Sequence, residues 1–266
     1  MGHEIRLFFA FTKVSMLTQM EYRGAYIVRS LGKLLHFGGG LAVLAIMLAR
    51  FQSIGTWSAY EVLFLYGLNI LTYAIAATFT MPIHNIGMRI RSGTIDTAMV
   101  RPVNPLYLII CQNASAGYTV NYILGVGVMV FAAINLQVQV TFLGITLLVL
   151  STIGGILIQG AFLIATGVPS FWLVKSNALS TIVGQASSFV EYPLNIYSRS
   201  IQFILTFILP FAFVSFYPAG LFLGKTHESI FGSGIYFLAP IVGIVCFVLA
   251  YKFWKIGLNA YQGTGS

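Results

Sequence analysis

Long apolar segments restrict what this chain can become more than any other feature of its sequence. Runs of about 18 or more mostly apolar residues recur along the chain, and such a run matches the hydrocarbon thickness of a bilayer. Of the 266 residues, 58% are hydrophobic and only 8% are charged. Soluble domains have roughly a quarter of their residues charged. The sequence therefore predicts an all-α integral membrane protein.

Hydropathy predicts six spanning helices within one transmembrane domain, residues 1–266. A segment before them, at about 3–22, has basic residues on one helix face and apolar residues on the other, and is expected to lie along the membrane surface as an amphipathic interfacial helix. The spans are expected at about 27–49, 59–82, 114–134, 142–168, 200–223 and 235–256.

The distribution of Lys and Arg predicts the orientation, because these residues accumulate on the cytoplasmic side. With the N-terminus inside, twelve basic residues are cytoplasmic and two, Arg50 and Lys225, are external. Both termini are therefore expected in the cytoplasm, and the net charge of +8 needs no nucleic-acid partner. The predicted cytoplasmic set is Arg6, Lys13, Arg23, Arg29, Lys33, Arg89, Arg91, Arg101, Lys175, Arg199, Lys252 and Lys255.

Several residue types inside the predicted spans indicate how the helices pack. Glycines at 38–40, 125 and 127, 154–155 and 160 are expected on close helix contacts. Pro210 interrupts the fifth span and predicts a kink or a short re-entrant piece. The three tryptophans fall at span edges and are expected in aromatic belts. Two cysteines, far apart, match no metal-binding spacing.

The predicted membrane interior offers few groups for chemistry. Ion-coupled transporters usually place ionisable residues at mid-membrane, and here His36 is the best such candidate for a substrate path, with a structural histidine as the alternative. Phe203, Phe207 and Phe211 are further path candidates. Ser115 has no histidine base in a later span, which excludes a serine protease. No phosphate-binding loop motif occurs, so ATP is not expected to bind by that device.

Charge and turn residues concentrate in one connection, RIRSGTIDTAMVRPVNPLY at 89–107. Thr94 is expected to cap a short helix at about 95–101, with Asp96 in its first turn and Pro102 ending it. The connection at 169–199 is predicted to hold a second interfacial helix on the same side. Both connections could also be plain cytoplasmic loops that follow the positive-inside rule.

Three strings carry a family resemblance. IRSGTIDTAMVRPVNPLY resembles the loop between the second and third spans of type 2 ABC exporter permeases, in the group linked to antibiotic, daunorubicin-like and viologen export. FVEYPLNIYSRSIQFILTFILPFAFVSFYPAG resembles a segment that leads into a span of that family, and FWKIGLNAYQGTGS resembles its ending. The matches run from about residue 85 to the C-terminus, so with the six spans the resemblance covers essentially the whole chain.

The resemblance implies a permease of the bacterial cytoplasmic membrane that moves an amphipathic drug, peptide antibiotic or lipid-like molecule by alternating access. It would pair with an identical or sister permease and dock on a separate ATPase subunit, which binds ATP and Mg. The chain itself would then be no enzyme and bind no cofactor, with membrane lipid around it. The alternatives are an ATP-independent secondary transporter or channel, and a polytopic scaffold.

The same resemblance implies that the loop is a coupling helix that inserts into the ATPase. The residues assigned to ATPase coupling are Arg89, Arg91, Gly93, Thr94, Asp96, Arg101, Pro102 and Asn104. A second cytoplasmic contact is assigned to Glu191, Tyr192 and Pro193.

Overall fold

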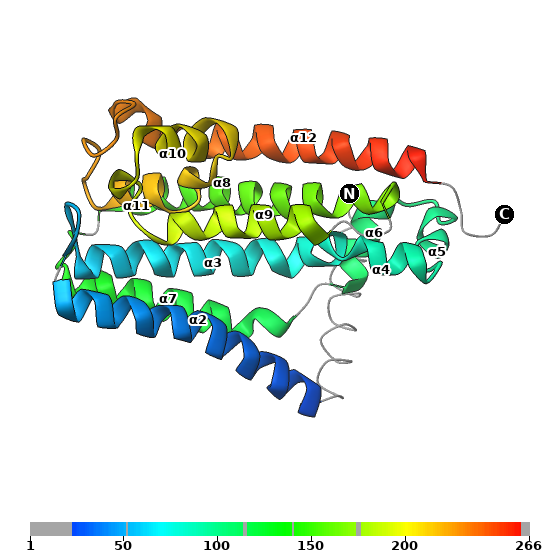
Figure 1. The fold of residues 1–266 in the computed structure, drawn as a ribbon, viewed down its shortest axis with the longest axis horizontal. Helices are drawn as coiled ribbons and strands as arrows, with labels where there is room; N and C mark the ends of the chain where they lie inside the picture. Colours follow the sequence, from blue (N-terminus) through cyan, green and yellow to red (C-terminus); the bar gives the residue numbers. More distant parts are fainter. Residues whose placement is uncertain (1–22, 52, 114–115, 140, 174–176, 262–266) are drawn as a thin grey trace.

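A computed structural model describes residues 23–51, 53–113, 116–139, 141–173 and 177–261. The predicted interfacial helix at 3–22 lies outside these residues. Long helices run side by side along one axis, and α2 tilts away from the rest (Figure 1). The long helices are α2 (Arg23–Phe51), α3 (Ala59–His84), α7 (Thr119–Asn135), α8 (Phe142–Gly167) and α12 (Ala239–Ala260).

Shorter elements join the long helices at the two ends of the bundle and along its side. The helices are α4 (Ile86–Arg91), α5 (Asp96–Met99), α6 (Pro105–Asn113), α9 (Asn177–Ser188), α10 (Arg199–Phe203) and α11 (Phe216–Phe222). The strands β1 (Ser53–Ile54) and β2 (Trp57–Ser58) form a small antiparallel hairpin. We call the end with this hairpin and the 223–238 connection the Thr56 end. The end with residues 85–105 and 168–173 is the Arg101 end.

Within the described residues, four helical segments are long and apolar enough to cross a membrane. They are Tyr26–Phe51, Ala59–Arg91, Phe142–Phe171 and Ala239–Ala260. They match the first, second, fourth and sixth predicted spans. The third, Thr119–Asn135, is a shorter apolar helix, because the chain just before it forms the separate helix α6 and a 3-10 turn at Ala116–Tyr118.

The fifth predicted span, 200–223, is interrupted at Pro210, as the sequence predicted. Residues Arg199–Ile208 and Phe211–Phe222 form two pieces bent by 77°, with Pro210 at the break. Proline has no backbone N–H and cannot continue the helical hydrogen-bond ladder. Both ends of this pair lie at the Thr56 end: Asn195 Nδ2 donates to Thr56 Oγ1 (2.7 Å) and Lys225 Nζ donates to the Thr56 carbonyl (2.6 Å). The pair enters and leaves on one side, as a re-entrant loop.

Helix α9, predicted to lie along the membrane surface, instead follows the length of the bundle between α3 and α8 (Figure 1). Ser180 and Thr181 border the same cavity as His84 at the Arg101 end, whereas the Val190 carbonyl accepts from Ser215 Oγ (2.7 Å) in the re-entrant pair. Residues 177–195 therefore carry the chain from the Arg101 end to the Thr56 end. Ser187 of α9 is half-buried on the cavity between α9, α3 and α8, whereas Thr181, Gln185 and Ser188 are exposed.

This path overturns two further predictions. Glu191, Tyr192 and Pro193 lie toward the Thr56 end and not with the residues assigned to ATPase coupling, so they form no second contact on that side. Arg199 also moves to the Thr56 end, four residues after Asn195. With Arg199 moved, the predicted count becomes eleven basic residues on the cytoplasmic side and three on the external side. The excess of basic residues stays on the cytoplasmic side.

Two of the three tryptophans do not form the predicted aromatic belt. Trp57 and Trp254 are 0% and 1% exposed, because each fills a packed core inside the protein. Trp57 packs on Phe216 (ring centroids 5.4 Å apart) and Trp254 on Phe171 (5.3 Å). Only Trp172, 47% exposed, lies on the surface.

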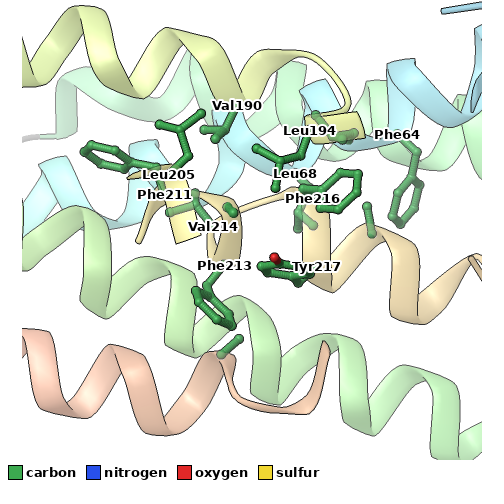
Figure 2. Packing of buried hydrophobic residues seen from close by; sticks show 14 of the residues in the cluster. Phe64, Leu68, Val190, Leu194, Leu205, Phe211, Phe213, Val214, Phe216 and Tyr217 are labelled. Atoms are coloured by element: carbon green, nitrogen blue, oxygen red, sulfur yellow. The ribbon is translucent and has the colours of Figure 1, made fainter. Parts of the chain in front are cut away.

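The largest core is built around the re-entrant pair (Figure 2). Phe216 lies beside Leu68 of α3, whereas Phe213 points to the opposite side of the pair, and Phe211, Phe213 and Phe216 are all nearly fully buried. A second core lies at the Arg101 end and joins the ends of α3, α8 and α12 to the loop and α6. Its members include Ile83, Ile95, Leu108, Ile164 and Trp254.

Glycine allows close backbone contact at two helix pairs. A Cβ atom on Gly67 of α3 would lie 3.0 Å from the Gly125 carbonyl oxygen of α7. A Cβ atom on Gly243 of α12 would lie 2.5 Å from the carbonyl oxygen of Gly154 in α8, closer than real Cβ contacts allow. Such approaches are common where helices pack in lipid. Gly38, Gly39 and Gly127 face open space within this chain.

We expect Gly243→Ala to lower the stability of the bundle by about 1–3 kcal/mol, because the added methyl forces α8 and α12 apart. Gly127→Ala in α7 is the matched control and should have little effect. Denaturant unfolding of the purified protein in detergent measures both. Equal stability of the two variants would contradict the close α8–α12 contact.

The re-entrant path makes a topological prediction. In a Cys111→Ala/Cys246→Ala background, Ser53→Cys and Ser198→Cys should react with an impermeant maleimide from the same side of the membrane. Thr97→Cys should react from the opposite side. If Ser198→Cys shares the side of Thr97→Cys, residues 200–223 cross the membrane after all.

Candidate functional site

The loop predicted to couple to a partner continues directly from α3. Helix α4 follows Asn85 and ends where Ser92 N–H donates to the Met88 carbonyl (3.1 Å). Gly93 then has φ +67°, a left-handed conformation that favours glycine. This turn reverses the chain into α5, so the glycine singled out in the sequence shapes the loop.

Helix α5 is shorter than predicted and is not capped by Thr94. It covers Asp96–Met99, and its N-cap position is Ile95 without a side-chain cap bond. Thr94 Oγ1 instead lies 2.9 Å from Ser92 Oγ. Asp96 lies in the first turn, as predicted. The chain turns sharply at Pro102, where Val103 N–H donates to the Arg101 carbonyl (2.8 Å).

One side of the loop is anchored to the bundle. Ile95 and Ala98 are 1% and 6% exposed and pack in the core of the Arg101 end. Asn104 Nδ2 donates to the hydroxyl of Tyr251 in α12 (2.9 Å), and its Oδ1 accepts from Leu106 N–H (3.0 Å). The loop is therefore connected to α3 through α4 and to α12 through Asn104.

The other side projects from the bundle. Met99, Val100, Arg101 and Pro102 are all exposed, and Val100 retains 84% of its accessible surface. We call these four residues the loop tip. An apolar side chain between an arginine and a methionine, held out by an anchored loop, is suited to contact another protein.

The other residues assigned to coupling lie behind this tip. Arg91 and Thr94 are exposed, whereas Arg89, Gly93 and Asp96 are half-buried. The structure thus brings the assigned residues of 89–104 into one loop at the Arg101 end.

A cavity of about 690 Å³ lies between α2, α3, α8 and α9. His36, a path candidate, lines it together with Asn69, Tyr73, Gln159 and Glu191. Asn69 and Gln159 are 9% and 5% exposed, and Gln159 Nε2 donates to Asn69 Oδ1 (3.3 Å). We call this space the α9 cavity, since α9 supplies much of its polar wall.

The sequence interpretation missed Asn69 and Gln159 because it searched the spans for ionisable residues only. The available signal was a single amide within each of two apolar runs, GLNILTY and ILIQGAF. Amides inside a membrane protein tend to bond to partners on other helices, and these two do.

The three phenylalanines predicted to line a substrate path lie in different surroundings. Phe211 is 1% exposed and packs on Phe162 (ring centroids 4.4 Å apart), so it belongs to the core. Phe203 and Phe207 are exposed, and Phe207 packs edge-on against Phe231 (5.0 Å) near the Thr56 end. Of the four candidates, only His36 lines the α9 cavity.

A polar cluster holds the Thr56 end together. Lys225 Nζ lies 2.9 Å from Glu61 Oε2, an ion pair with partly exposed side chains. Thr56 Oγ1 donates to Glu228 Oε2 (2.6 Å), and Asn195 Nδ2 donates to the same carboxylate oxygen (2.9 Å). The cluster joins the start of α3, the end of the α9 segment and the loop before α12.

Tyr197 lies beside this cluster and donates its hydroxyl to the Phe189 carbonyl (3.0 Å). Burial raises the pKa of Tyr197 to about 12, with smaller contributions from Tyr192 and Glu191. The hydroxyl therefore stays protonated at neutral pH and keeps its donor role.

No group of three or more metal-ligating side chains occurs in the described part of the chain. Cys111 is buried, Cys246 is partly buried, and both are free thiols.

The family model described as "ABC-2 family transporter protein" matches residues 34–265. The chain belongs to the ABC-2 transporter family. This membership makes it the transmembrane component of an ABC-type transporter and implies an ATPase partner in the same system. No curated protein and no solved structure matches the chain.

We expect Asn69→Leu to destabilise the protein by about 1–3 kcal/mol, because it leaves the Gln159 amide buried without its partner. The double variant Asn69→Leu/Gln159→Leu should be less destabilised than the sum of the single variants. Asn135→Leu, at an exposed position, is the control. Unfolding measurements on the four proteins test this, and strict additivity would exclude the coupling.

Proposed function

We propose that this chain is the permease subunit of an ABC exporter that moves an amphipathic molecule across the bacterial cytoplasmic membrane. The observation that carries the proposal is the exposed loop tip, Met99–Pro102, on a loop anchored to α3 and α12. Family membership supplies the ATPase that such a tip would contact. ATP and Mg are held by that subunit.

The orientation follows from charge. Of the basic residues in the described part of the chain, eight lie toward the Arg101 end and three, Arg50, Arg199 and Lys225, toward the Thr56 end, which makes the Arg101 end the cytoplasmic side. Helix α2 begins and α12 ends on this side (Figure 1), which agrees with the predicted cytoplasmic termini. The loop tip then faces the compartment that contains ATP.

The connections of the loop support a mechanical role. When ATP closes the ATPase subunits, they displace the loop tip. Helix α4 transmits this displacement to α3, and the Asn104–Tyr251 hydrogen bond transmits it to α12. Helix α3 also forms a wall of the α9 cavity, so movement at the tip changes the shape of the cavity. Hydrolysis reverses the change, which gives alternating access.

The α9 cavity supports an amphipathic cargo. It combines amides, hydroxyls, His36 and Glu191 with the aromatic surfaces of Phe37 and Tyr73. Sites for small molecules usually combine an apolar lining with a few polar groups that orient the ligand. A second permease, identical or a sister chain, would complete the passage beside α2, whose apolar side chains are largely exposed.

Arg101→Glu should weaken association with the ATPase by about tenfold or more, since it reverses a charge at the contact. Arg50→Glu makes the same charge change on the exposed last turn of α2 at the Thr56 end and should leave association unchanged. Co-purification with the partner ABC ATPase, together with substrate-stimulated ATP hydrolysis, measures both.

Equal retention of the ATPase by the two variants would reject the loop tip as the contact. Vanadate-insensitive transport by the chain alone, reconstituted without an ATPase, would instead support an ATP-independent transporter.

A further inference from the structure

A second cavity, of about 470 Å³, lies at the Arg101 end between α2, the end of α3 and the loop. Its charged lining residues are Lys33 and Arg89, and the described residues around it include no acidic side chain. It lies behind the loop tip, although Arg89 and Thr94 in its lining are also among the residues assigned to ATPase coupling. We call it the Arg89 cavity.

Arg89 is half-buried, and the structure gives its guanidinium no hydrogen-bond or ion-pair partner in the described part of the chain. Withdrawing a cation from water without an acceptor is unfavourable. The flat guanidinium carries several N–H donors in an arrangement that matches the oxygens of a phosphate. The missing acceptor is therefore most simply supplied by an anionic ligand.

Lys33 provides a second cation on the α2 wall of the cavity. Its ammonium group donates to the Gly117 carbonyl (2.6 Å) and lies 3.1 Å from the centre of the Tyr118 ring. Tyr118 is itself 5% exposed. These contacts hold the Lys33 charge in place, so the cavity has a positive wall on the helix opposite Arg89.

Neutral donors and apolar side chains complete the lining. The hydroxyl oxygens of Ser92 and Thr94 lie 2.9 Å apart on the rim formed by the loop. Met81, Pro82 and Met88 form an apolar wall, and Met88 is 67% exposed. A ligand that fits this lining has an anionic polar group and an attached apolar part.

The position of the cavity relative to the membrane distinguishes among such ligands. Arg89 is in the last turn of the apolar segment Ala59–Arg91, and Lys33 is in the segment Tyr26–Phe51. The cavity therefore lies where the hydrocarbon layer meets water, the level of lipid headgroups. Basic pockets between spanning helices on the cytoplasmic side are suited to anionic lipid headgroups.

We propose that the Arg89 cavity binds the phosphate group of an anionic phospholipid. Arg89 and Lys33 face the phosphate from the loop and from α2, and the Ser92 and Thr94 hydroxyls donate to its oxygens. The glycerol and first acyl carbons lie against Met81 and Pro82. The lipid joins α2 to the coupling loop, and this binding does not require an ATPase.

The test uses the purified full-length chain in detergent, without an ATPase, and a fluorescent phosphatidylglycerol probe. Unlabelled phosphatidylglycerol should displace the probe at about tenfold lower concentration than phosphatidylcholine, which carries no net charge. Arg89→Gln should weaken phosphatidylglycerol binding by about tenfold. Arg101→Gln removes the same charge from an exposed position outside the cavity and should change binding by less than about twofold.

Three outcomes of these measurements would contradict the proposal. Equal weakening by Arg89→Gln and Arg101→Gln would show general surface attraction and overturn the site. Displacement by millimolar inorganic phosphate as complete as by the lipid would show a site for free phosphate and overturn the lipid assignment. If Arg89→Gln does not fold, equal affinity of the wild-type chain for the two lipids still refutes the proposal.

Lipid binding is measured on the chain without an ATPase, whereas the ATPase contact is measured by co-purification with the loop-tip variant Arg101→Glu. The lipid site and the permease function can therefore fail independently.

Discussion

Backbone hydrogen bonding in a medium without water constrains the whole structure. Every N–H and C=O in hydrocarbon must find a partner inside the protein, and the long helices meet this requirement locally. The break at Pro210 does not, and it occurs where residues 210–220 are all buried. There Leu209 N–H donates to the Ile204 carbonyl (2.8 Å) and Val214 N–H to the Phe211 carbonyl (2.9 Å). The aromatic core in Figure 2 therefore permits the re-entrant turn.

The same constraint explains why α9 can follow the bundle although it contains many hydroxyl and amide groups. Polar groups on α3 and α8 share its cavity, and the buried Asn69–Gln159 pair lies on the facing helices. A polar face that would be unstable against lipid is stable against another polar face. The α9 cavity thus combines polar groups of α3, α8 and α9 with apolar surface.

Helix α3 connects the features assigned to function. Its first turn carries Glu61 in the cluster at the Thr56 end, its middle carries Asn69 in the α9 cavity, and its end leads through α4 into the coupling loop. The Arg89 cavity is built on the last part of this path. A rigid helix with contacts at both ends and in its middle can convert a contact at the loop tip into a change in the cavity.

The sequence by itself determined the membrane class, four long spanning helices and the loop with Gly93, Asp96 and Pro102, because hydropathy and turn chemistry depend on neighbouring residues. It also carried the family, through strings that match it along the chain. Only the tertiary structure decided the path of residues 177–222. Hydropathy evaluates each segment against lipid or water, whereas Asn195 and Lys225 hold both ends of the re-entrant pair at Thr56. Those contacts join residues more than 100 positions apart, and no local pattern encodes them.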